Sequence, residues 1–319
     1  MKHFILSSLA IGLTAGIAYA QEPVWDANTI VLESQKLAEG VFAVIPTGAT
    51  EMAENGFPIA TSAGFVIGEN GVLIVESMLN ENLTDQLLDL IAKETDRPIR
   101  YLVNTSYHGD HSYGNQYIPD SVDIIQHANT AAYIRGNLEA DKVFMMQNFG
   151  QGRGIEDIVA TDADILIGES GSLTINLGRI SVDIKDYGFA QTGGDLFVSV
   201  PDANVLWTGN AIVAQAPALP WLLDGKLLET RKTLASVYGD FNADTLVVPG
   251  HGPVTDISAV KWAVDYLTAV ETDVSVALGE GLSLEQTIQR VQLPDFQGYA
   301  LFGWVHSSMN VPVAYAELQ

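Results

Sequence analysis

The feature that most constrains the fold of this chain is an alternation of short apolar runs with helical segments, in which several runs end at glycine or histidine. The sequence "TSAGFVIGENGVLIVE" (residues 61–76) holds two apolar runs around an Asn-Gly pair, which predicts a β-hairpin. A helix that Asn80 can cap follows, and "IRYLVNTS" (residues 99–106) has the composition of a buried strand. The segment "DTLVVPGHG" (residues 244–252) repeats this pattern. The alternation predicts an α/β fold, in which polar loops at strand ends commonly carry the chemistry.

Strand-like segments also fill residues 172–209, where glycines and a Pro-Asp pair separate four apolar runs. A helix is expected over residues 226–238. The last sixty residues have a helical pattern, and Ser283 with Gln286 forms a capping box at the start of one helix. Residues 145–157, in contrast, contain the glycines and polar side chains that are typical of a long mobile loop.

The beginning of the chain has the pattern of a secretory signal peptide: one lysine, a short apolar run, and Ala18-Tyr19-Ala20 at its end. We therefore expect residues 1–20 to be removed and residues 21–319 to form a single domain with C-terminal helices, in the periplasm or secreted. No later stretch is apolar enough for stable insertion in a membrane. The net charge of −24, from 15 basic and 39 acidic residues, would repel nucleic acid. A small-molecule substrate or ligand is the expected partner.

The stretch "VNTSYHGDHSYGN" (residues 103–115) places His108, Asp110 and His111 together after a predicted strand. His251 lies between two glycines in another such loop. The chain has no cysteine, so a metal site must use histidine and carboxylate ligands. Two imidazoles and one carboxylate, with a fourth position for water, are a recognised zinc arrangement and also suit iron. A histidine beside an aspartate is equally compatible with a plain hydrogen-bonded pair, so the local spacing leaves metal binding open.

Taken in order, the hairpin, the helix, "YLVNTSYHGDHSYGN", "YGFAQTGGDLFVSVPDANVLWTGN" and "VVPGHGP" closely resemble the metallo-β-lactamase-fold superfamily. The likeness is greatest to its exported or periplasmic hydrolase-like members, and it extends from about Gly40 to the C-terminus. The resemblance implies an αββα sandwich, with metal ions bound at the rim between the two sheets.

The resemblance also assigns metal-binding roles to individual positions. The family's first metal would use Ser106, His108 and Gln191, its second metal would use Asp110, His111 and His251, and Asn210 would be the bridging position. Serine, glutamine and asparagine thus stand where the family has two histidines and an aspartate. All three changes affect the first metal or the bridge, whereas the second triad is intact. The comparison predicts an empty first site and one zinc ion at the second.

Three functions are compatible with this pattern. The chain can be an exported mononuclear zinc hydrolase of a small-molecule ester, thioester or amide. His108 and Asp110 are then the expected catalytic residues, with His108 either as general base or as the group that orients the water. Gln191 and Asn210 would hold the substrate or the developing oxyanion. Alternatively, the two amides satisfy each other in a filled pocket, and the chain is a non-catalytic ligand-binding or scaffold protein without a functional metal centre. Redox chemistry on iron is the third possibility.

Residues outside the metal motif admit two interpretations each. Trp221 lies in an apolar loop after Asn210 and is either a wall of the substrate pocket or a part of the core. Tyr107 either donates a hydrogen bond to substrate or packs its own loop. His306 and Asn310 stand about one turn apart if the C-terminal stretch is helical, which favours a packing or capping pair over catalysis.

Overall fold

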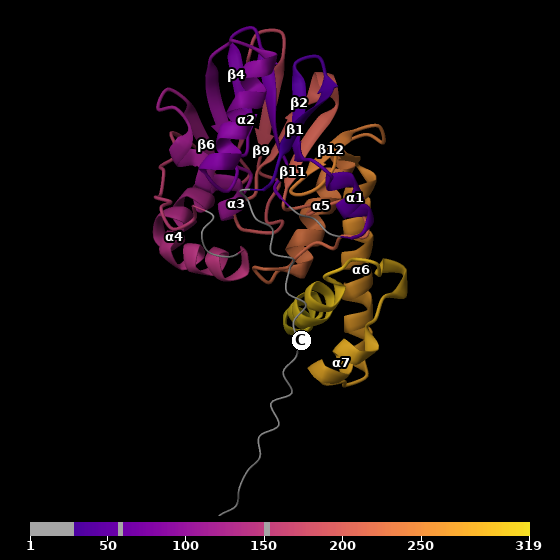
Figure 1. Cartoon of the computed structure of the whole chain (residues 1–319). Coiled ribbons are helices and arrows are strands. Elements are labelled where there is room, and N and C mark those ends of the chain that lie inside the picture. Colours follow the sequence, from indigo (N-terminus) through magenta and orange to yellow (C-terminus); the bar gives the residue numbers. More distant parts are fainter. Residues whose placement is uncertain (1–28, 57–59, 150–153) are drawn as a thin grey trace, which may run out of the picture.

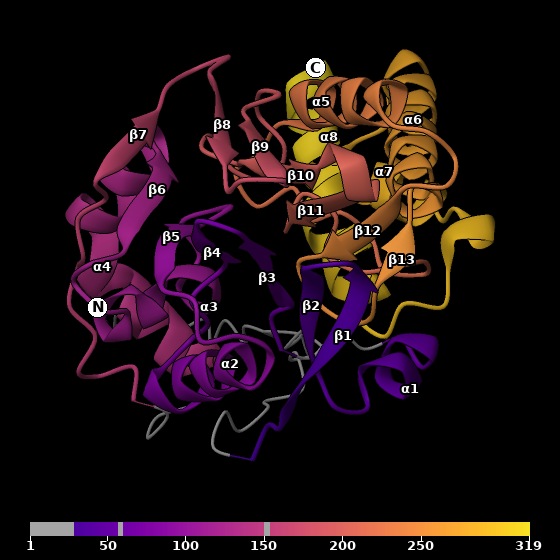
Figure 2. The same cartoon turned by 90° about the horizontal axis from the view of Figure 1, so that it is seen from above.

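The computed structural model describes residues 29–56, 60–149 and 154–319, which form two β-sheets packed face to face with helices on both outer faces (Figures 1 and 2). This architecture is the predicted αββα sandwich. The predicted signal peptide, residues 1–20, lies outside the described residues. In the described part of the chain, no helix has both the length and the apolar character that crossing a membrane requires.

The first sheet has seven strands, which lie side by side in the order of the chain. They are β1 Leu32–Ala38, β2 Val41–Pro46, β3 Ala63–Gly68, β4 Gly71–Val75, β5 Ile99–Val103, β6 Asp123–His127 and β7 Ile165–Ile167. The predicted hairpin is confirmed, because β3 and β4 pair antiparallel and Gly68 pairs with Gly71 across the turn. From β4 to β7 the strands are parallel, so their carboxyl ends meet at one edge.

The second sheet has six strands in the order β13-β12-β11-β10-β9-β8. Their bounds are β8 Ser172–Asn176, β9 Ser181–Lys185, β10 Phe197–Val200, β11 Val205–Gly209, β12 Leu246–Pro249 and β13 Thr255–Asp256. Only β11 and β12 among these pair in parallel. The loops that follow these two strands, which contain Asn210 and His251, therefore leave the sheet at the same edge.

The helices are α1 Ala49–Glu54, α2 Glu81–Glu94, α3 Gly109–Ser112, α4 Ala128–Phe149, α5 Leu227–Asp240, α6 Ser258–Gly279, α7 Leu284–Arg290 and α8 Val311–Leu318. Three short 3-10 helices are η1 Tyr113–Tyr117, η2 Pro201–Ala203 and η3 Pro294–Phe296. The segment η4, Gly303–Asn310, is a π-helix and leads directly into α8.

Apolar side chains fill three layers of this sandwich. Leu83 and Leu87 on α2 pack against the outer face of the first sheet. The layer between the sheets contains Trp207, which is 1% exposed. The third layer lies between the second sheet and the helices α5, α6 and α8. Burial of each large apolar side chain contributes about 1.5–3 kcal/mol, so the sandwich is a rigid support for its edge loops.

Both predicted helix caps are confirmed. The Asn80 side chain accepts a hydrogen bond of 3.0 Å from the Leu83 N–H at the start of α2. Ser283 and Gln286 form the reciprocal capping box of α7. The helix expected over residues 226–238 is α5, whose bounds differ by one or two residues.

The prediction of a loop over residues 145–157 is wrong in its first part, because α4 continues to Phe149. Met145 is 2% exposed and packs in the layer under the first sheet. The Lys142 ammonium group donates to the Ile158 carbonyl oxygen at 3.1 Å, which ties the helix to the segment that follows it. Tertiary contacts thus hold as a helix a stretch whose composition favours a loop.

Candidate metal centre

The predicted ligands lie close together at the edge of the sandwich where the parallel strands of both sheets have their carboxyl ends. β5 leads through a short loop into α3, whose first turn carries Asp110 and His111. His251 comes from the other sheet, after β12. The two sheets are joined at this point, because the Ser62 N–H donates to the Gly250 carbonyl oxygen at 2.8 Å.

Asp110, His111 and His251 form a possible metal-binding group. The Oδ2 atom of Asp110 lies 3.5 Å from Nε2 of His111 and 3.5 Å from Nε2 of His251. Ligand atoms around a tetrahedral zinc ion with bonds of about 2.1 Å are about 3.4 Å apart. Nε2 of His111 is buried without a hydrogen-bond partner among the described residues, as expected of an atom that binds a metal. The three side chains therefore fit a zinc ion.

The charge states of these residues also suit a cation. Burial opposes ionisation of Asp110, but the facing imidazoles of His111 and His251 lower its pKa to about 2. Burial lowers the pKa of His251 to about 4, which leaves its ring neutral. Burial likewise opposes the charged form of His111, but Asp110 and Glu76 raise its pKa to about 9. The raised pKa of His111 means that a cation that binds here would compete with a proton for its ring.

Glu76, a buried carboxylate that the sequence pattern did not identify, orients His111. Its Oε1 atom lies 3.0 Å from Nδ1 of His111. Thr105 donates to Glu76 from its N–H, at 3.1 Å, and from its hydroxyl group. Glu76 has a left-handed φ of 68°, a costly conformation that these contacts hold in place. A carboxylate behind a ligating histidine fixes the tautomer and makes the ligand more basic, so Nε2 of His111 faces the ligand group.

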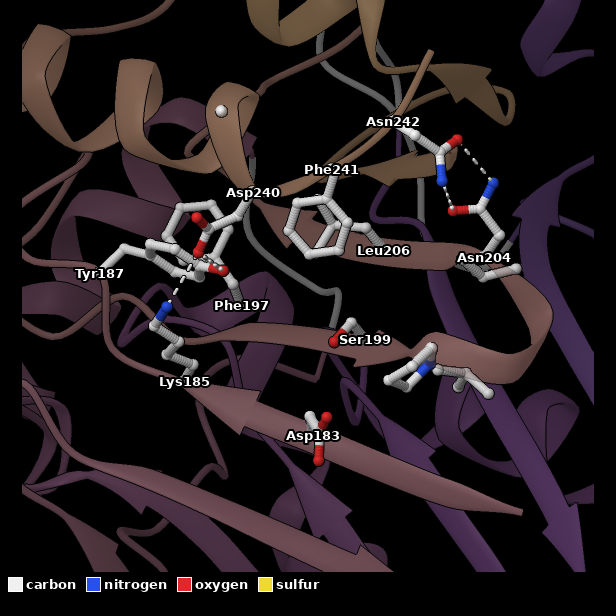
Figure 3. A pocket seen from close by; sticks show the side chains of 14 residues that line it. Asp183, Lys185, Tyr187, Phe197, Ser199, Asn204, Leu206, Asp240, Phe241 and Asn242 are labelled. Atoms are coloured by element: carbon white, nitrogen blue, oxygen red, sulfur yellow. Dashed lines mark hydrogen bonds and ion pairs between the residues drawn. The ribbon is translucent and has the colours of Figure 1, made fainter. Parts of the chain in front are cut away.

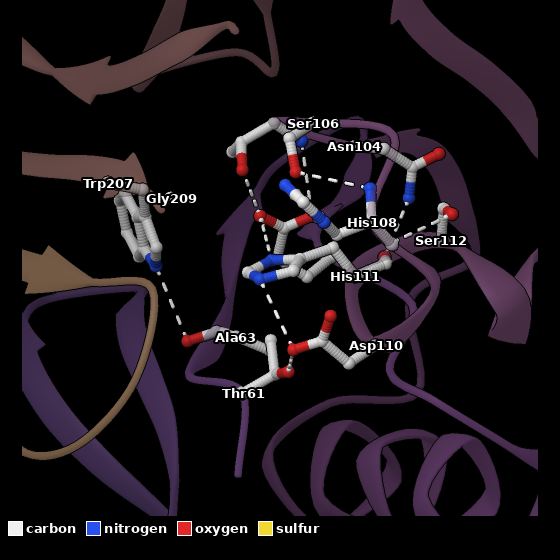
Figure 4. A network of polar contacts seen from close by, with 12 residues as sticks. Thr61, Ala63, Asn104, Ser106, His108, Asp110, His111, Ser112, Trp207 and Gly209 are labelled. Atoms are coloured by element: carbon white, nitrogen blue, oxygen red, sulfur yellow. Dashed lines mark hydrogen bonds and ion pairs between the residues drawn. The ribbon is translucent and has the colours of Figure 1, made fainter. Parts of the chain in front are cut away.

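Two further side chains that the sequence pattern did not identify support the ligands, as Figure 4 shows. The Thr61 hydroxyl donates to Oδ2 of Asp110 at 2.7 Å. The Asn104 amide donates to the backbone oxygen of His111 at 3.0 Å. The Asn104 side-chain oxygen also accepts a bond of 2.8 Å from Gln126. Each ligand on α3 is thus held by a neighbour that does not itself bind the metal.

The positions assigned to the first metal lie at the same edge but lack a ligand set. Ser106 is fully buried, and its hydroxyl oxygen accepts the His108 N–H at 3.4 Å. Gln191 and Asn210 are 3% and 8% exposed, and their side-chain oxygens have no hydrogen-bond partner within the described ranges. Asn210 fits tightly, since a Cβ atom at Gly250 would lie 2.1 Å from its oxygen. A hydroxyl and two neutral amides are poor zinc ligands.

Burial lowers the pKa of His108 to about 4, although Asp110 acts in the opposite direction. Its Nε2 atom has no hydrogen bond of good geometry in the part of the chain that the structure describes. The Gln191 side chain lies close enough to the ring to raise the pKa of His108 in part. His108 is therefore a neutral imidazole with one free nitrogen beside the ligand group.

Tyr107 and Trp221 both have packing partners. The Tyr107 hydroxyl donates to the Asp224 carboxylate at 3.0 Å, and its ring stacks on Tyr133 with 3.7 Å between ring centres. Trp221 packs edge-to-face on Trp304 of η4 with 4.9 Å between ring centres. The packing interpretation therefore describes Tyr107, while contact of Trp221 with a substrate stays a prediction.

A separate groove of about 670 Å³ lies over β9, β10 and β11 beside the end of α5 (Figure 3). Its polar side chains pair mainly with one another: Lys185 with Asp240 at 3.0 Å, and Asn204 with Asn242 at 3.2 Å. None of the predicted site residues lines it. The ligand group at the sheet edge therefore remains the candidate site.

Comparison with known proteins supports this assignment of the fold and edge. The sequence profile of the Metallo-beta-lactamase superfamily matches residues 56–251, a range that contains all three ligand residues. A solved metallo-beta-lactamase from Pontibacter korlensis is 18% identical, with 74% of this chain and 99% of that chain covered and a TM-score of 0.55. A stereoselective inverting sec-alkylsulfatase from Pseudomonas sp. is 14% identical, with 90% of this chain but 50% of that chain covered and a TM-score of 0.67.

Proposed function

Because this chain belongs to the metallo-beta-lactamase superfamily, we propose that it is an exported hydrolase that works with a single zinc ion. The proposed substrate is an ester, thioester or amide of a small molecule. The observation that carries the proposal is the intact, pre-arranged group of Asp110, His111 and His251, with ligand atoms at zinc-compatible separations. The signal-peptide pattern in residues 1–20 supports export to the periplasm or beyond.

In this proposal Asp110, His111 and His251 would hold the zinc ion, which would supply Lewis acidity and lower the pKa of a water molecule. Burial lowers the pKa of His108 and favours its neutral ring, whose Nε2 atom could accept a proton from the water that attacks the substrate. Asp110 is both a ligand and the carboxylate that faces His108. Its low pKa keeps it ionised throughout the reaction.

Gln191 and Asn210 are proposed to hold the substrate. Each presents a buried amide whose oxygen has no partner among the described residues, so a ligand can satisfy a group that the folded chain leaves unpaired. An amide oxygen accepts hydrogen bonds, so each of these oxygens is suited to an N–H or O–H group of the substrate. Neither residue needs to bind a metal for this role.

A second candidate function rests on the same residues. The loss of two histidines and an aspartate from the family pattern also suits a non-catalytic protein that binds a small ligand at this edge. The two candidates differ in whether the protein has a functional metal centre and turnover, and metal analysis of one pair of variants separates them.

The test is metal content per chain by plasma mass spectrometry, on protein exported to the periplasm and purified without chelator or metal-affinity resin. We expect about one zinc in wild type and in Gln191→Ala, and none in His251→Ala, because His251 supplies one of three ligands. Hydrolysis of 4-nitrophenyl acetate, an acetyl thioester and 4-nitroacetanilide would be measured on the same samples. Iron in place of zinc would favour redox chemistry, and no bound metal in wild type would favour the non-catalytic ligand-binding candidate.

A further inference from the structure

A buried polar network joins the C-terminal helices to the loop between β11 and α5. Its side chains are Tyr266 on α6 and His306 and Asn310 on η4, and all three are fully buried. The segment η4 is a π-helix, a rare conformation that is frequent at functional sites. This network lies outside residues 56–251, the range that the superfamily profile matches.

The chemical groups in this network determine which atom donates and which accepts in each hydrogen bond. The Val291 carbonyl can only accept, so His306 donates to it from Nε2, at 2.8 Å, and leaves Nδ1 as an acceptor. The Tyr266 hydroxyl donates to Nδ1 of His306 at 2.8 Å and accepts from the Asn310 amide at 3.0 Å. Burial lowers the pKa of His306, which agrees with this neutral tautomer.

Asn310 connects this network to the loop between β11 and α5. Its second N–H donates to the Pro220 carbonyl oxygen at 2.7 Å, and its oxygen accepts the Leu222 N–H at 3.0 Å. Trp221, between these two residues, packs on Trp304 of the same π-helix. Asn310 therefore uses its whole amide group to hold the backbone on both sides of Trp221.

The loop that Asn310 holds contacts the metal edge near both of its ends. Near its start, the Val213 carbonyl oxygen accepts the His251 N–H at 2.8 Å. Near its end, the Asp224 carboxylate accepts the Tyr107 hydroxyl, and the Tyr107 ring lies 4.7 Å from the ring of His108. A displacement of this loop would therefore reach the side of the site where His108 lies.

We propose that Asn310 is a positioning residue for the hydrolytic site: it fixes residues 211–224 so that Asp224 holds Tyr107 and His108 in place. The proposal rests on the proposed function. Asp110 and His111 have their own supports in Thr61 and Glu76. The Val213 carbonyl oxygen that accepts the His251 N–H lies at the far end of the loop from Pro220 and Leu222, the residues that Asn310 holds. Loss of Asn310 should therefore disturb the end of the loop beside His108 and leave metal binding intact. Asn310 itself touches neither substrate nor metal in this role.

The test compares Asn310→Ala with Tyr315→Phe, a control that also removes a hydrogen bond from the C-terminal helices, the one to the Leu282 carbonyl oxygen, but does not touch the loop. Chymotrypsin cleavage at Trp221 and Leu223, followed by mass spectrometry, reports opening of the loop without any substrate. We expect Asn310→Ala to be cleaved about tenfold faster than wild type, and Tyr315→Phe to be unchanged. Equal cleavage rates in all three proteins would overturn the proposal.

Turnover supplies the second measurement, on whichever of the three acyl compounds wild type hydrolyses best. We expect kcat of Asn310→Ala to fall about tenfold or more, with KM within about twofold and one zinc retained, because the general base is misplaced while the ligands are not. A variant with an open loop and unchanged kcat would show that Asn310 acts on the fold alone.

Asp224→Ala removes only the hydrogen bond between the loop and the Tyr107 hydroxyl. It replaces Asn310→Ala as the test variant if Asn310→Ala does not fold. It should lower kcat in the same way while chymotrypsin cleavage at Trp221, which is not adjacent to the substitution, stays at the wild-type rate. An unchanged kcat would overturn the proposed route through Tyr107. Wild-type protein that binds no zinc and hydrolyses none of the compounds would refute the proposed function. The cleavage rates would still show whether Asn310 holds the loop, so the two failures are distinguishable.

Discussion

Two sets of side chains at one sheet edge are equally buried but differently supported. Asp110 and His111 are each held by a neighbour, Thr61 and Glu76, which orients the atom that faces the ligand group. Gln191 and Asn210, in contrast, have side-chain oxygens without partners among the described residues. Each buried polar atom left without a partner costs about 1–3 kcal/mol. The first set is therefore built to hold a cation, and the second is built to gain from a polar ligand.

The largest effect is expected from a pair of variants, one that removes a negative charge from the first set of side chains and one that adds a negative charge to the second set. Asp110→Asn keeps the shape of the side chain but removes the anion that lies 3.5 Å from both histidines. We expect zinc affinity to fall by about a thousandfold, equivalent to about 4 kcal/mol, in competition with a chromophoric chelator. Asn210→Asp is the matched variant, and it should still bind one zinc, since Ser106 and Gln191 remain poor ligands. Two zinc ions in Asn210→Asp would show that the first site is only one charge away from function.

A smaller effect is expected at Glu76, which does not touch the metal. Glu76→Gln keeps the volume but weakens the contact with Nδ1 of His111 and removes a negative charge. Loss of such an outer carboxylate typically lowers metal affinity by about 10–100-fold. Glu69→Gln is the control, because Glu69 is an exposed acid that pairs with Arg179. Equal zinc affinity in Glu76→Gln and wild type would mean that the ligand group does not depend on its support.

The three ligand residues could be singled out from the sequence because their signals are local, but only the family resemblance assigned them to one metal site. Asp110 and His111 are neighbours in one motif, and His251 stands between two glycines at the end of an apolar run. The hairpin before them and the cap at Asn80 follow from turn and capping preferences. The position of each ligand at a strand end required only the order of strands and helices.

The supporting residues could not be predicted, because their partners are distant in the sequence. Thr61 is 49 positions from Asp110, and Asn310 is 90 positions from Pro220. Glu76 offered one local signal: it is an acidic residue directly after the apolar strand β4, where an unpaired carboxylate would be costly. Long-range pairing of this kind is set by the packed fold rather than by sequence periodicity.

The smallest expected effect concerns Thr61. It tests whether loss of a neutral supporting side chain lowers zinc affinity less than loss of a charged one. Thr61→Val keeps the shape but removes the hydroxyl that donates to Oδ2 of Asp110. A hydrogen bond to a charged group contributes about 1.5 kcal/mol at the lower end, so zinc affinity should fall by about tenfold. Ser106→Ala is the matched variant on the other side of the edge, where the hydroxyl oxygen only accepts a long bond from the His108 N–H, and its zinc affinity should equal that of wild type. If Ser106→Ala weakens zinc binding as much as Thr61→Val does, the two sets of side chains act as one site, and the division between a metal-holding set and a substrate-holding set is wrong.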